Sequence, residues 1–280
     1  MNFSNRLKWI IVLIYTSSLV VCNAQNDKVF IDKYLKELPA SKIMDKSVQK
    51  YNMTAVYLNR DLYGNFTSKT RVSGDYTRGF KGDTVCWNNV YISGSQKYEE
   101  PFSKGTKVDY IENYRYVPSD DMLKPDAFKN FSPIPENIFA RNLIWDMFTL
   151  EIFAWNYFDS LKLNQEYIIP DIKGEFDMAE IGKYMHSRIF MKWKGVTEFE
   201  GELCAILDFT ADDNKIEMNM AQIKTKGTEQ YWGSILVSLR TKSIEYAEMY
   251  GGTMQEIEVA GMKDKLLIKT IRELEVTRIR

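Results

Sequence analysis

The chain has 280 residues, with 37 Lys and Arg against 38 Asp and Glu and one histidine. The near-zero net charge gives no electrostatic reason to expect nucleic acid as a partner. A hydrophobic share of 45% excludes a wholly disordered chain. A chain of this length can bury a sizeable core, and one histidine makes multi-histidine metal sites poor candidates.

The first 24 residues have the layout of a secretory signal peptide. Arg6 and Lys8 precede an apolar stretch, and small residues at Cys22 and Ala24 suit cleavage before Gln25. The apolar run is too short for a comfortable membrane span, and three Thr and Ser residues dilute it. We therefore expect a signal peptide at 1–24 and no transmembrane span in the mature chain.

A lipid anchor at Cys22 is the alternative that the same segment raises. Leu19 to Cys22 looks like a bacterial lipobox, but Val21 stands where such a box has Gly, Ala or Ser. We therefore do not expect lipidation. The layout is typical of exported proteins of Gram-negative bacteria, which places the mature chain in the periplasm or the outer cell envelope.

The mature chain is expected to begin with an amphipathic helix. Asp27 is a suitable N-cap, Pro39 ends the helix, and the apolar residues between them fall at helical spacing. Strand-rich sequence follows, with strands predicted at 51–58, 66–76, 84–92 and 107–117. Four prolines between Pro118 and Pro135 then predict an irregular crossing loop.

Residues 137–161 form the strongest predicted helix. It is apolar over most of its circumference, which indicates a buried helix. Its charged residues, among them Asp146 and Glu151, argue against a membrane span because charges there are costly. We therefore expect this helix to pack in the hollow of a curved sheet.

The remainder of the chain is predicted to be strands, at 188–194, 202–209, 216–224, 230–240, 243–250, 253–259 and 265–279. Asp212-Asp213-Asn214 favours a tight turn between two of them, and Thr241-Lys242 a hairpin turn. Short links between successive strands indicate antiparallel pairing. Similar Gly-containing segments, Phe80–Asp83 and Phe199–Glu202, raise the possibility of duplicated halves, 51–117 and 188–280, joined by 118–163.

These elements predict a single α+β domain over 25–280. Its expected fold is a curved antiparallel β-sheet, like half of a barrel, packed around a central apolar helix, with the N-terminal amphipathic helix beside it. The element order resembles that of the periplasmic lipoprotein-carrier class, and this resemblance implies a lipid or a lipoprotein acyl chain as partner. The stretches 141–146 (RNLIWD) and 231–239 (YWGSILVSL) also resemble uncharacterised secreted bacterial families.

The sequence carries none of the common catalytic motifs. The sequence has no GxGxxG, P-loop, HExxH or CxxC pattern, and His186 has no accompanying nucleophile motif. Asp146 and Glu151 are five residues apart, so a helix turns them about 140° from each other. We expect no enzyme, no catalytic residue, no metal and no cofactor.

The aromatic residues carry the functional hypothesis. Side chains that could line an apolar pocket are Trp145, Phe148, Ile152 and Trp155 on the helix and Tyr231 and Trp232 on the sheet. Ordinary aromatic packing and an exposed sugar-binding platform remain the alternatives. The expected function is binding of an apolar or amphiphilic ligand in the cell envelope, and the alternative is a glycan- or protein-binding module with a solid core. The ligand and the oligomeric state stay open.

Cys86 and Cys204 are the cysteines that remain after removal of residues 1–24. An even pair in an oxidising compartment favours a disulfide. Both lie in apolar, strand-like sequence, which favours two buried free thiols equally well.

Overall fold

The computed structural model describes residues 47–132, 137–170, 174–220 and 222–280, which belong to one compact unit, Ser41–Arg280. The predicted signal peptide and the predicted N-terminal helix lie outside the described residues.

Within these residues a 13-stranded sheet forms, and its strand pairs are antiparallel. The strands of the first half are β1 (Gln49–Asp61), β2 (Phe66–Lys81), β3 (Thr84–Ser95), β4 (Thr106–Lys107) and β5 (Tyr114–Tyr116). The strands of the second half are β6 (Glu166–Ile168), β7 (Gly174–Asp177), β8 (Gly182–His186), β9 (Arg188–Phe199), β10 (Glu202–Met220), β11 (Ile223–Ser238), β12 (Ile244–Val259) and β13 (Leu266–Ile279). Antiparallel pairing is therefore confirmed.

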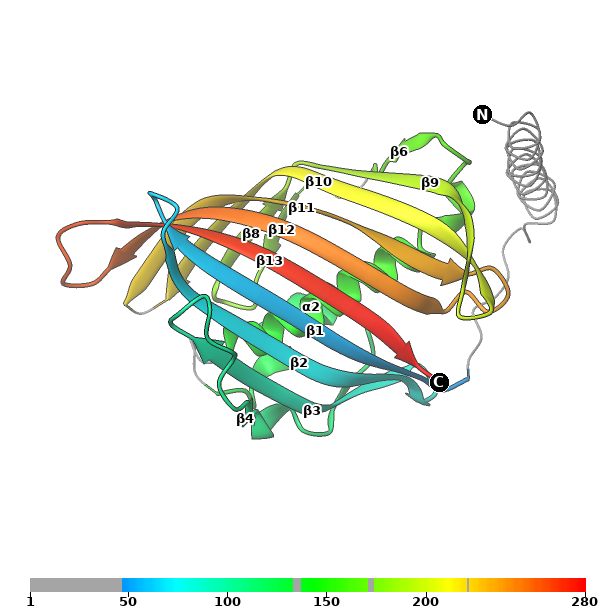
Figure 1. The fold of residues 1–280 in the computed structure, drawn as a ribbon, viewed down its shortest axis with the longest axis horizontal. Coiled ribbons are helices and arrows are strands. Elements are labelled where there is room, and N and C mark those ends of the chain that lie inside the picture. The colour runs from blue at the N-terminus through cyan, green and yellow to red at the C-terminus, as the bar shows by residue number, and fades with distance from the viewer. Residues whose placement is uncertain (1–46, 133–136, 171–173, 221) are drawn as a thin grey trace, which may run out of the picture. The chain divides into compact units, whose positions relative to one another are not determined.

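The sheet is built from two wings that meet at its centre. Its order is β4-β3-β2-β1-β13-β12-β11-β10-β8-β7, with β9 also paired to β10 (Figure 1). The first and last long strands are neighbours, with Met53 of β1 opposite Val276 of β13. One wing consists of β1 to β5 and the other of β6 to β13, of which β6, β7 and β8 precede the predicted half 188–280. The described strands leave the sheet open, with β4 at one end and β7 at the other.

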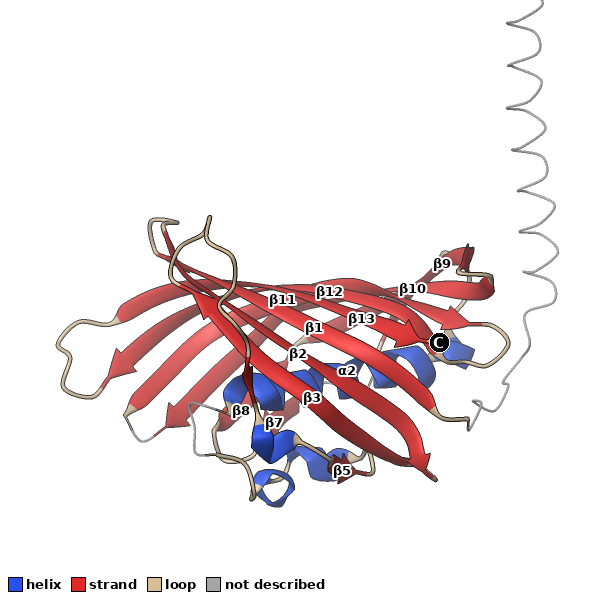
Figure 2. Ribbon diagram, turned by 60° about the horizontal axis from the view of Figure 1, so that its bottom comes forward, coloured by secondary structure: helices blue, strands red, loops and turns tan. Residues whose placement is uncertain are grey.

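The sheet curves around the helix α2 (Ile138–Trp155), which lies along its inner face (Figure 2). Alternate residues of each strand point to this face. On β1 they include Tyr51, Met53 and Ala55, each 0% exposed. In the described stretches of chain no helix has both the length and the apolar character needed to cross a bilayer.

Close packing holds α2 against the sheet. Leu143 lies over Gly74 of β2, where an added Cβ would lie 3.4 Å from the Leu143 side chain and only 2.8 Å from Val90. Phe153 packs against Phe209 of β10, with ring centroids 5.0 Å apart. A glycine at position 74 therefore leaves room for Val90 of β3 and for Leu143 of the helix.

The proline-rich segment covers another part of α2. It contains two short 3₁₀ helices, η2 (Asp120–Leu123) and η3 (Pro125–Phe128), rather than wholly irregular chain. Trp145 donates its indole N–H to the carbonyl of Met122 at 2.9 Å, and Phe128 packs edge-on against the Trp145 ring. The helix is thus held between this segment and the sheet.

Three predicted strand breaks are wrong, and one of them, at 225–229, lies inside β11. Residues 202–220 form one strand, β10, and Asp212-Asp213-Asn214 lies in a β-bulge at which Asp213 has φ +55°. Residues 244–259 likewise form one strand, β12. Asp and Asn tolerate positive φ, so the same residues suit a bulge as well as a turn. The Thr241-Lys242 turn is confirmed, with Lys242 at φ +59°.

Two other predicted elements differ in extent, and three short strands were not predicted. The strand predicted at 107–117 is broken into β4, a 3₁₀ turn at Asp109–Ile111 and β5. The helix predicted to reach residue 161 ends at Trp155. The short strands β6, β7 and β8 were not predicted, because three to five residues carry too little period-2 pattern to recognise.

Of the two alternatives for the cysteines, the structure shows two buried free thiols. Cys86 lies on β3 and Cys204 on β10, and five strands separate these two in the sheet order. A disulfide needs Cα atoms within about 7 Å of each other, whereas neighbouring strands are already about 4.8 Å apart. Of the two alternatives left open by the sequence, the structure therefore has the free thiols.

Candidate functional site

A cavity of about 560 Å³ lies between α2 and the inner face of the sheet. Its lining includes helix residues from Ile138 to Asn156, which at 1.5 Å per residue are spread over about 27 Å of helix axis. The facing wall comes from β1 and from β7 to β13. The volume falls in the range of about 300–1,000 Å³ typical of small-molecule sites.

Apolar side chains make up much of the wall. From the helix come Phe139, Trp145, Phe148, Ile152 and Phe153, and from the sheet Phe176, Ile189, Ile216, Met218, Tyr231 and Met249. Methionine and aromatic walls adapt to apolar ligands of irregular shape. The cavity therefore offers a long apolar surface.

A buried charged cluster interrupts this surface where the helix faces β11 and β13. Arg272 donates a hydrogen bond of 2.9 Å to Asp146 of α2, and its other terminal nitrogen lies 3.6 Å from Glu229. The hydroxyl of Tyr184 donates to the second oxygen of Glu229 at 2.6 Å. One guanidinium thus stands between two carboxylates, all of them lining the cavity.

Two polar atoms of the cavity wall, Asp146 Oδ2 and Arg272 Nε, are buried without a hydrogen-bond partner, and the hydroxyl of Tyr57 is buried beside them within reach of Asn142 and Arg272. A buried polar group left unpaired costs about 1–3 kcal/mol. These atoms include an acceptor, a donor and a hydroxyl that is both. A polar group inside the cavity would remove that cost.

The same burial changes the proton affinity of the cluster. It raises the pKa of Asp146 to about 6, against the opposing effect of Arg272. Burial also raises the pKa of Tyr184, and the neighbouring Glu229 adds to the rise. Burial favours the uncharged form of Arg272, but Asp146 and Glu229 outweigh it and raise the pKa of the guanidinium. Arg272 is therefore a permanent cation.

His186 lies on the cavity wall at the end of β8. Its Nδ1 is 3.3 Å from the side-chain oxygen of Asn214, and its ring packs edge-on against Tyr184 at 4.7 Å between centroids. Burial lowers the pKa of His186, so the ring is neutral at pH 7. Its surroundings are those of a packed aromatic wall.

The structure brings together four of the six residues predicted to line a pocket. Trp145, Phe148, Ile152 and Tyr231 all line the cavity. Trp155 instead donates to the carbonyl of Lys242 at 2.7 Å and lies under the guanidinium of Arg78. Trp232 points to the outer face, 44% exposed, because it follows the inward-facing Tyr231 directly on β11.

The polar half of the site was missed by the sequence prediction. Arg272, Glu229 and Tyr184 were not singled out, and Asp146 was considered only as a partner for Glu151. A signal exists for Arg272, since it stands at period 2 with Leu274 and Val276, which are both buried. An arginine on the apolar face of a strand indicates a buried partner.

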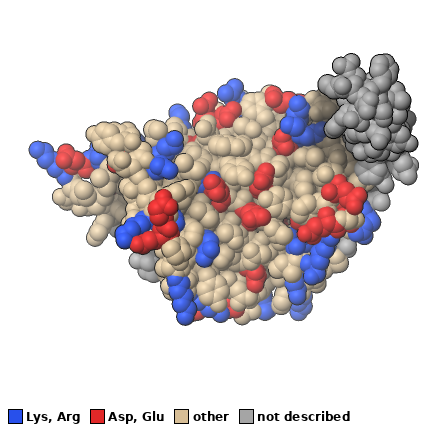
Figure 3. All heavy atoms as spheres, in the orientation of Figure 1, with Lys and Arg blue, Asp and Glu red and all other residues tan. Residues whose placement is uncertain are grey.

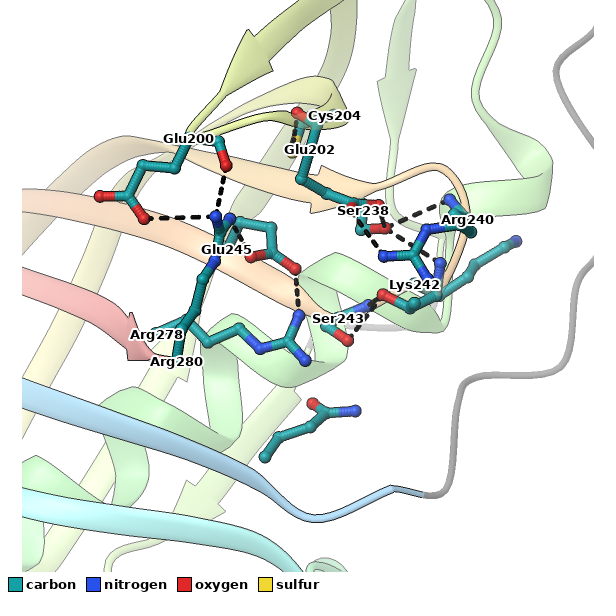
Figure 4. A network of polar contacts seen from close by, with 12 residues as sticks. Glu200, Glu202, Cys204, Ser238, Arg240, Lys242, Ser243, Glu245, Arg278 and Arg280 are labelled. Carbon is teal, nitrogen blue, oxygen red and sulfur yellow. Dashed lines mark hydrogen bonds and ion pairs between the residues drawn. The ribbon is translucent and has the colours of Figure 1, made fainter.

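Two other buried charged clusters lie outside the cavity. Glu151 accepts from Tyr76 at 2.6 Å and from Arg78 at 2.7 Å, so it faces a different set of residues from Asp146. Figure 4 shows the second cluster, in which Glu245, 1% exposed, accepts from Arg278 and Arg280. Both carboxylates of these clusters are paired with cations.

Beside Glu245, Glu202 accepts from Ser238 at 2.6 Å and from Arg240 at 2.7 Å (Figure 4). The carboxylates of this cluster are paired with cations and accept hydrogen bonds. The cluster therefore has a structural role, because it links the ends of β11, β12 and β13. It offers no unpaired atom to a ligand among its carboxylates.

A second hollow, of about 620 Å³, lies on the surface over β5, η2 and η3. Its lining is rich in charged residues, and two of these, Asp121 and Lys124, are exposed and pair with each other at 2.6 Å. Such an open, solvated surface holds no buried group that needs a partner. The cavity beneath α2 is therefore the candidate site.

In the part of the chain that the structure describes, no three His, Cys, Asp or Glu side chains gather in an arrangement that would hold a metal ion. No protein-family model matches this chain, and no curated protein matches its sequence.

Proposed function

We propose that this is an exported, non-enzymatic protein of the cell envelope that binds an amphiphilic ligand in the cavity between α2 and the sheet. The observation that carries the proposal is the combination of a long apolar wall with buried polar atoms that have no partner. An acyl chain, free or on a lipid or lipoprotein, suits the apolar part. Each buried CH₂ contributes about 0.8 kcal/mol to binding.

The lining explains why a chain-like ligand fits better than a compact one. The lining residues extend along the whole helix, so the volume is distributed over a length rather than gathered in one chamber. The polar cluster at Asp146 and Arg272 gives a head group a place to form hydrogen bonds. The apolar length and the polar cluster together support an amphiphile as the ligand.

Native and denaturing mass spectra of the purified protein test the proposal directly. We expect an adduct in the native spectrum that disappears on denaturation and that fragments as an amphiphile. Loading the protein with a long-chain amphiphile, if no ligand co-purifies, should produce the same one-to-one adduct. Neither a natural nor a loaded adduct would contradict the proposal.

Two variants and a control locate the ligand. Phe148→Asp places a charge on the apolar wall, and Thr149→Trp fills the cavity from the helix. We expect both to abolish the adduct in a folded protein. Thr210→Trp is the control, because it makes the same change in size at a residue outside the cavity. Thr210 follows the buried Phe209 on β10, so its side chain points to the other face of the sheet. The adduct should remain in this variant.

A second candidate function rests on the outer face of the sheet, which Figure 3 shows with charges scattered among uncharged side chains. Trp232 and Tyr250 stack there, with ring centroids 6.3 Å apart, and are 44% and 37% exposed. Exposed aromatic rings of this kind suit a sugar. A glycan array with the protein and with Trp232→Ala tests it, and signal that Trp232→Ala removes would favour this function.

A further inference from the structure

Acidic side chains outnumber basic ones in the cavity lining, and this affects which head group the ligand can have. Among the described lining residues are four carboxyl groups, Asp120, Asp146, Asp177 and Glu229, and one guanidinium, Arg272. The imidazole of His186 is neutral because burial lowers its pKa. The lining therefore carries an excess of negative charge.

The acidic groups occupy two levels of the site. Asp120 and Asp177 are exposed, so they lie where the cavity meets solvent. Asp146 and Glu229 are inside, with side chains 9% and 13% exposed. A head group placed at the inner level lies beside both Asp146 and Glu229, and one that enters from solvent passes exposed carboxyl groups of the lining.

Arg272 does not reverse this excess. Its two terminal nitrogens face Asp146 at 2.9 Å and Glu229 at 3.6 Å, so its charge is already shared between two carboxylates. An anionic head group would compete with them for the guanidinium and would face both at close range in a medium of low dielectric. Like charges placed there cost several kcal/mol of affinity.

The buried atoms without a hydrogen-bond partner also favour a head group that is not anionic. Asp146 is 7% exposed, and its Oδ2 accepts no hydrogen bond. This oxygen needs a donor, which an amine, a hydroxyl or an amide supplies and a carboxylate or phosphodiester does not. A hydroxyl or amide also offers an acceptor to Arg272 Nε, which has no partner either.

We infer that the cavity selects amphiphiles whose head group donates hydrogen bonds and carries no negative charge, such as a long-chain amine, alcohol or amide, over fatty acids and anionic phospholipids. The inference rests on the proposed function, since it specifies the ligand of the same cavity. It follows from the four carboxyl groups of the lining and the unpaired oxygen of Asp146.

A chain-matched series tests the inference. Dodecylamine, 1-dodecanol and dodecanoate share one apolar chain and differ in the head group, and each is titrated into the purified protein at pH 7.5 below its micelle concentration. We expect the amine and the alcohol to bind at least about tenfold more tightly than dodecanoate, a ratio that corresponds to about 1.4 kcal/mol. Dodecanoate that binds as tightly as the other two would overturn the inference and leave the proposed function standing. No saturable binding by any of the three would overturn both.

The double variant Asp146→Asn/Glu229→Gln assigns the selectivity to the cavity. Both substitutions keep a side-chain oxygen for Arg272 and Tyr184 while two negative charges are removed. Circular dichroism and a cooperative unfolding transition establish that the variant is folded before it is titrated. We expect the preference for dodecylamine over dodecanoate to fall at least tenfold. Glu273→Gln, a neighbour of Arg272 that points to the outer face and is exposed, is the matched control and should leave the preference unchanged. An unchanged preference in the double variant would overturn the assignment.

Discussion

Arg272 of β13 donates a hydrogen bond of 2.9 Å to Asp146 of α2, across 126 residues of sequence. This contact joins the helix to the central strand of the sheet at the place where the cavity is polar. It therefore has two consequences, one for the attachment of the helix and one for the chemistry that a ligand meets. The two are separable by experiment because different substitutions affect them.

Arg272→Gln should destabilise the protein by about 3 kcal/mol. The change leaves the carboxylates of Asp146 and Glu229 close together without the cation between them, and breaking a buried pair from one side typically costs about 3–5 kcal/mol. Urea unfolding followed by tryptophan fluorescence measures the loss. Arg188→Gln is the matched control, because its pair with Asp213 is exposed at 3.5 Å and contributes less than about 1 kcal/mol. Equal losses in the two variants would contradict the buried pair.

Asp146 should make the stability depend on pH in an unusual direction. Burial raises its pKa from 3.8 to about 6, so between these values the folded protein holds a proton that the unfolded chain releases. Stability from this group is therefore complete below about pH 4 and is lost as the pH rises through 6. The shift of about two units corresponds to about 3 kcal/mol.

The comparison with Asp146→Asn isolates this effect. Other carboxyl groups, including the buried Glu151, titrate in both proteins and cancel in the difference. We expect the stability of the wild type relative to the variant to fall by about 3 kcal/mol from pH 4 to pH 7. Unfolding curves at half-unit pH steps give the difference. Parallel pH profiles of the two proteins would contradict a raised pKa at Asp146.

Local sequence pattern predicts the inner face of the sheet well. Leu274 and Val276 alternate with exposed residues on β13, and the apolar residues of α2 indicate a buried helix. Period and composition are local properties, so they can be recognised without the fold. For this reason the sequence could point to Trp145, Phe148 and Ile152, which line the cavity, but it pointed equally to Trp155, which does not.

The pairing of distant strands was not predictable in the same way. Met53 is opposite Val276 because β1 and β13 meet at the sheet centre, and no local pattern identifies that neighbour. Because this pairing cannot be read from the sequence, Arg272 cannot be identified as the partner of Asp146. The polar part of the site therefore cannot be predicted either. The bulge at Asp213 is a related case, since its positive φ suits either a turn or a bulge and the sheet decides which forms.

The two described cysteines should be unreactive in the folded protein and free after unfolding. Both are 0% exposed, and burial raises the pKa of the Cys204 thiol to about 12, so little thiolate exists at pH 8. Iodoacetamide labelling without reductant, followed by peptide mapping, should modify Cys86 and Cys204 only in denaturant. A peptide pair linked through these two residues would show instead that the alternative with a disulfide holds.

The cluster at Glu245 should be required for the local stability of the two central strands where β12 begins and β13 ends. Glu245 is 1% exposed and binds Arg278 and Arg280, so Glu245→Ala leaves two guanidinium groups without their carboxylate. We expect a loss of about 3 kcal/mol in urea unfolding, as for other buried pairs broken from one side. Glu200→Ala is the control, because that carboxylate is 56% exposed at 3.6 Å from Arg280 and contributes less than about 1 kcal/mol. Hydrogen exchange adds a local measurement, since the amides near Ile244 and Ile279 should lose protection in Glu245→Ala before those of β1. Uniform loss of protection across the sheet would mean that Glu245 stabilises the whole fold and not only the start of β12 and the end of β13.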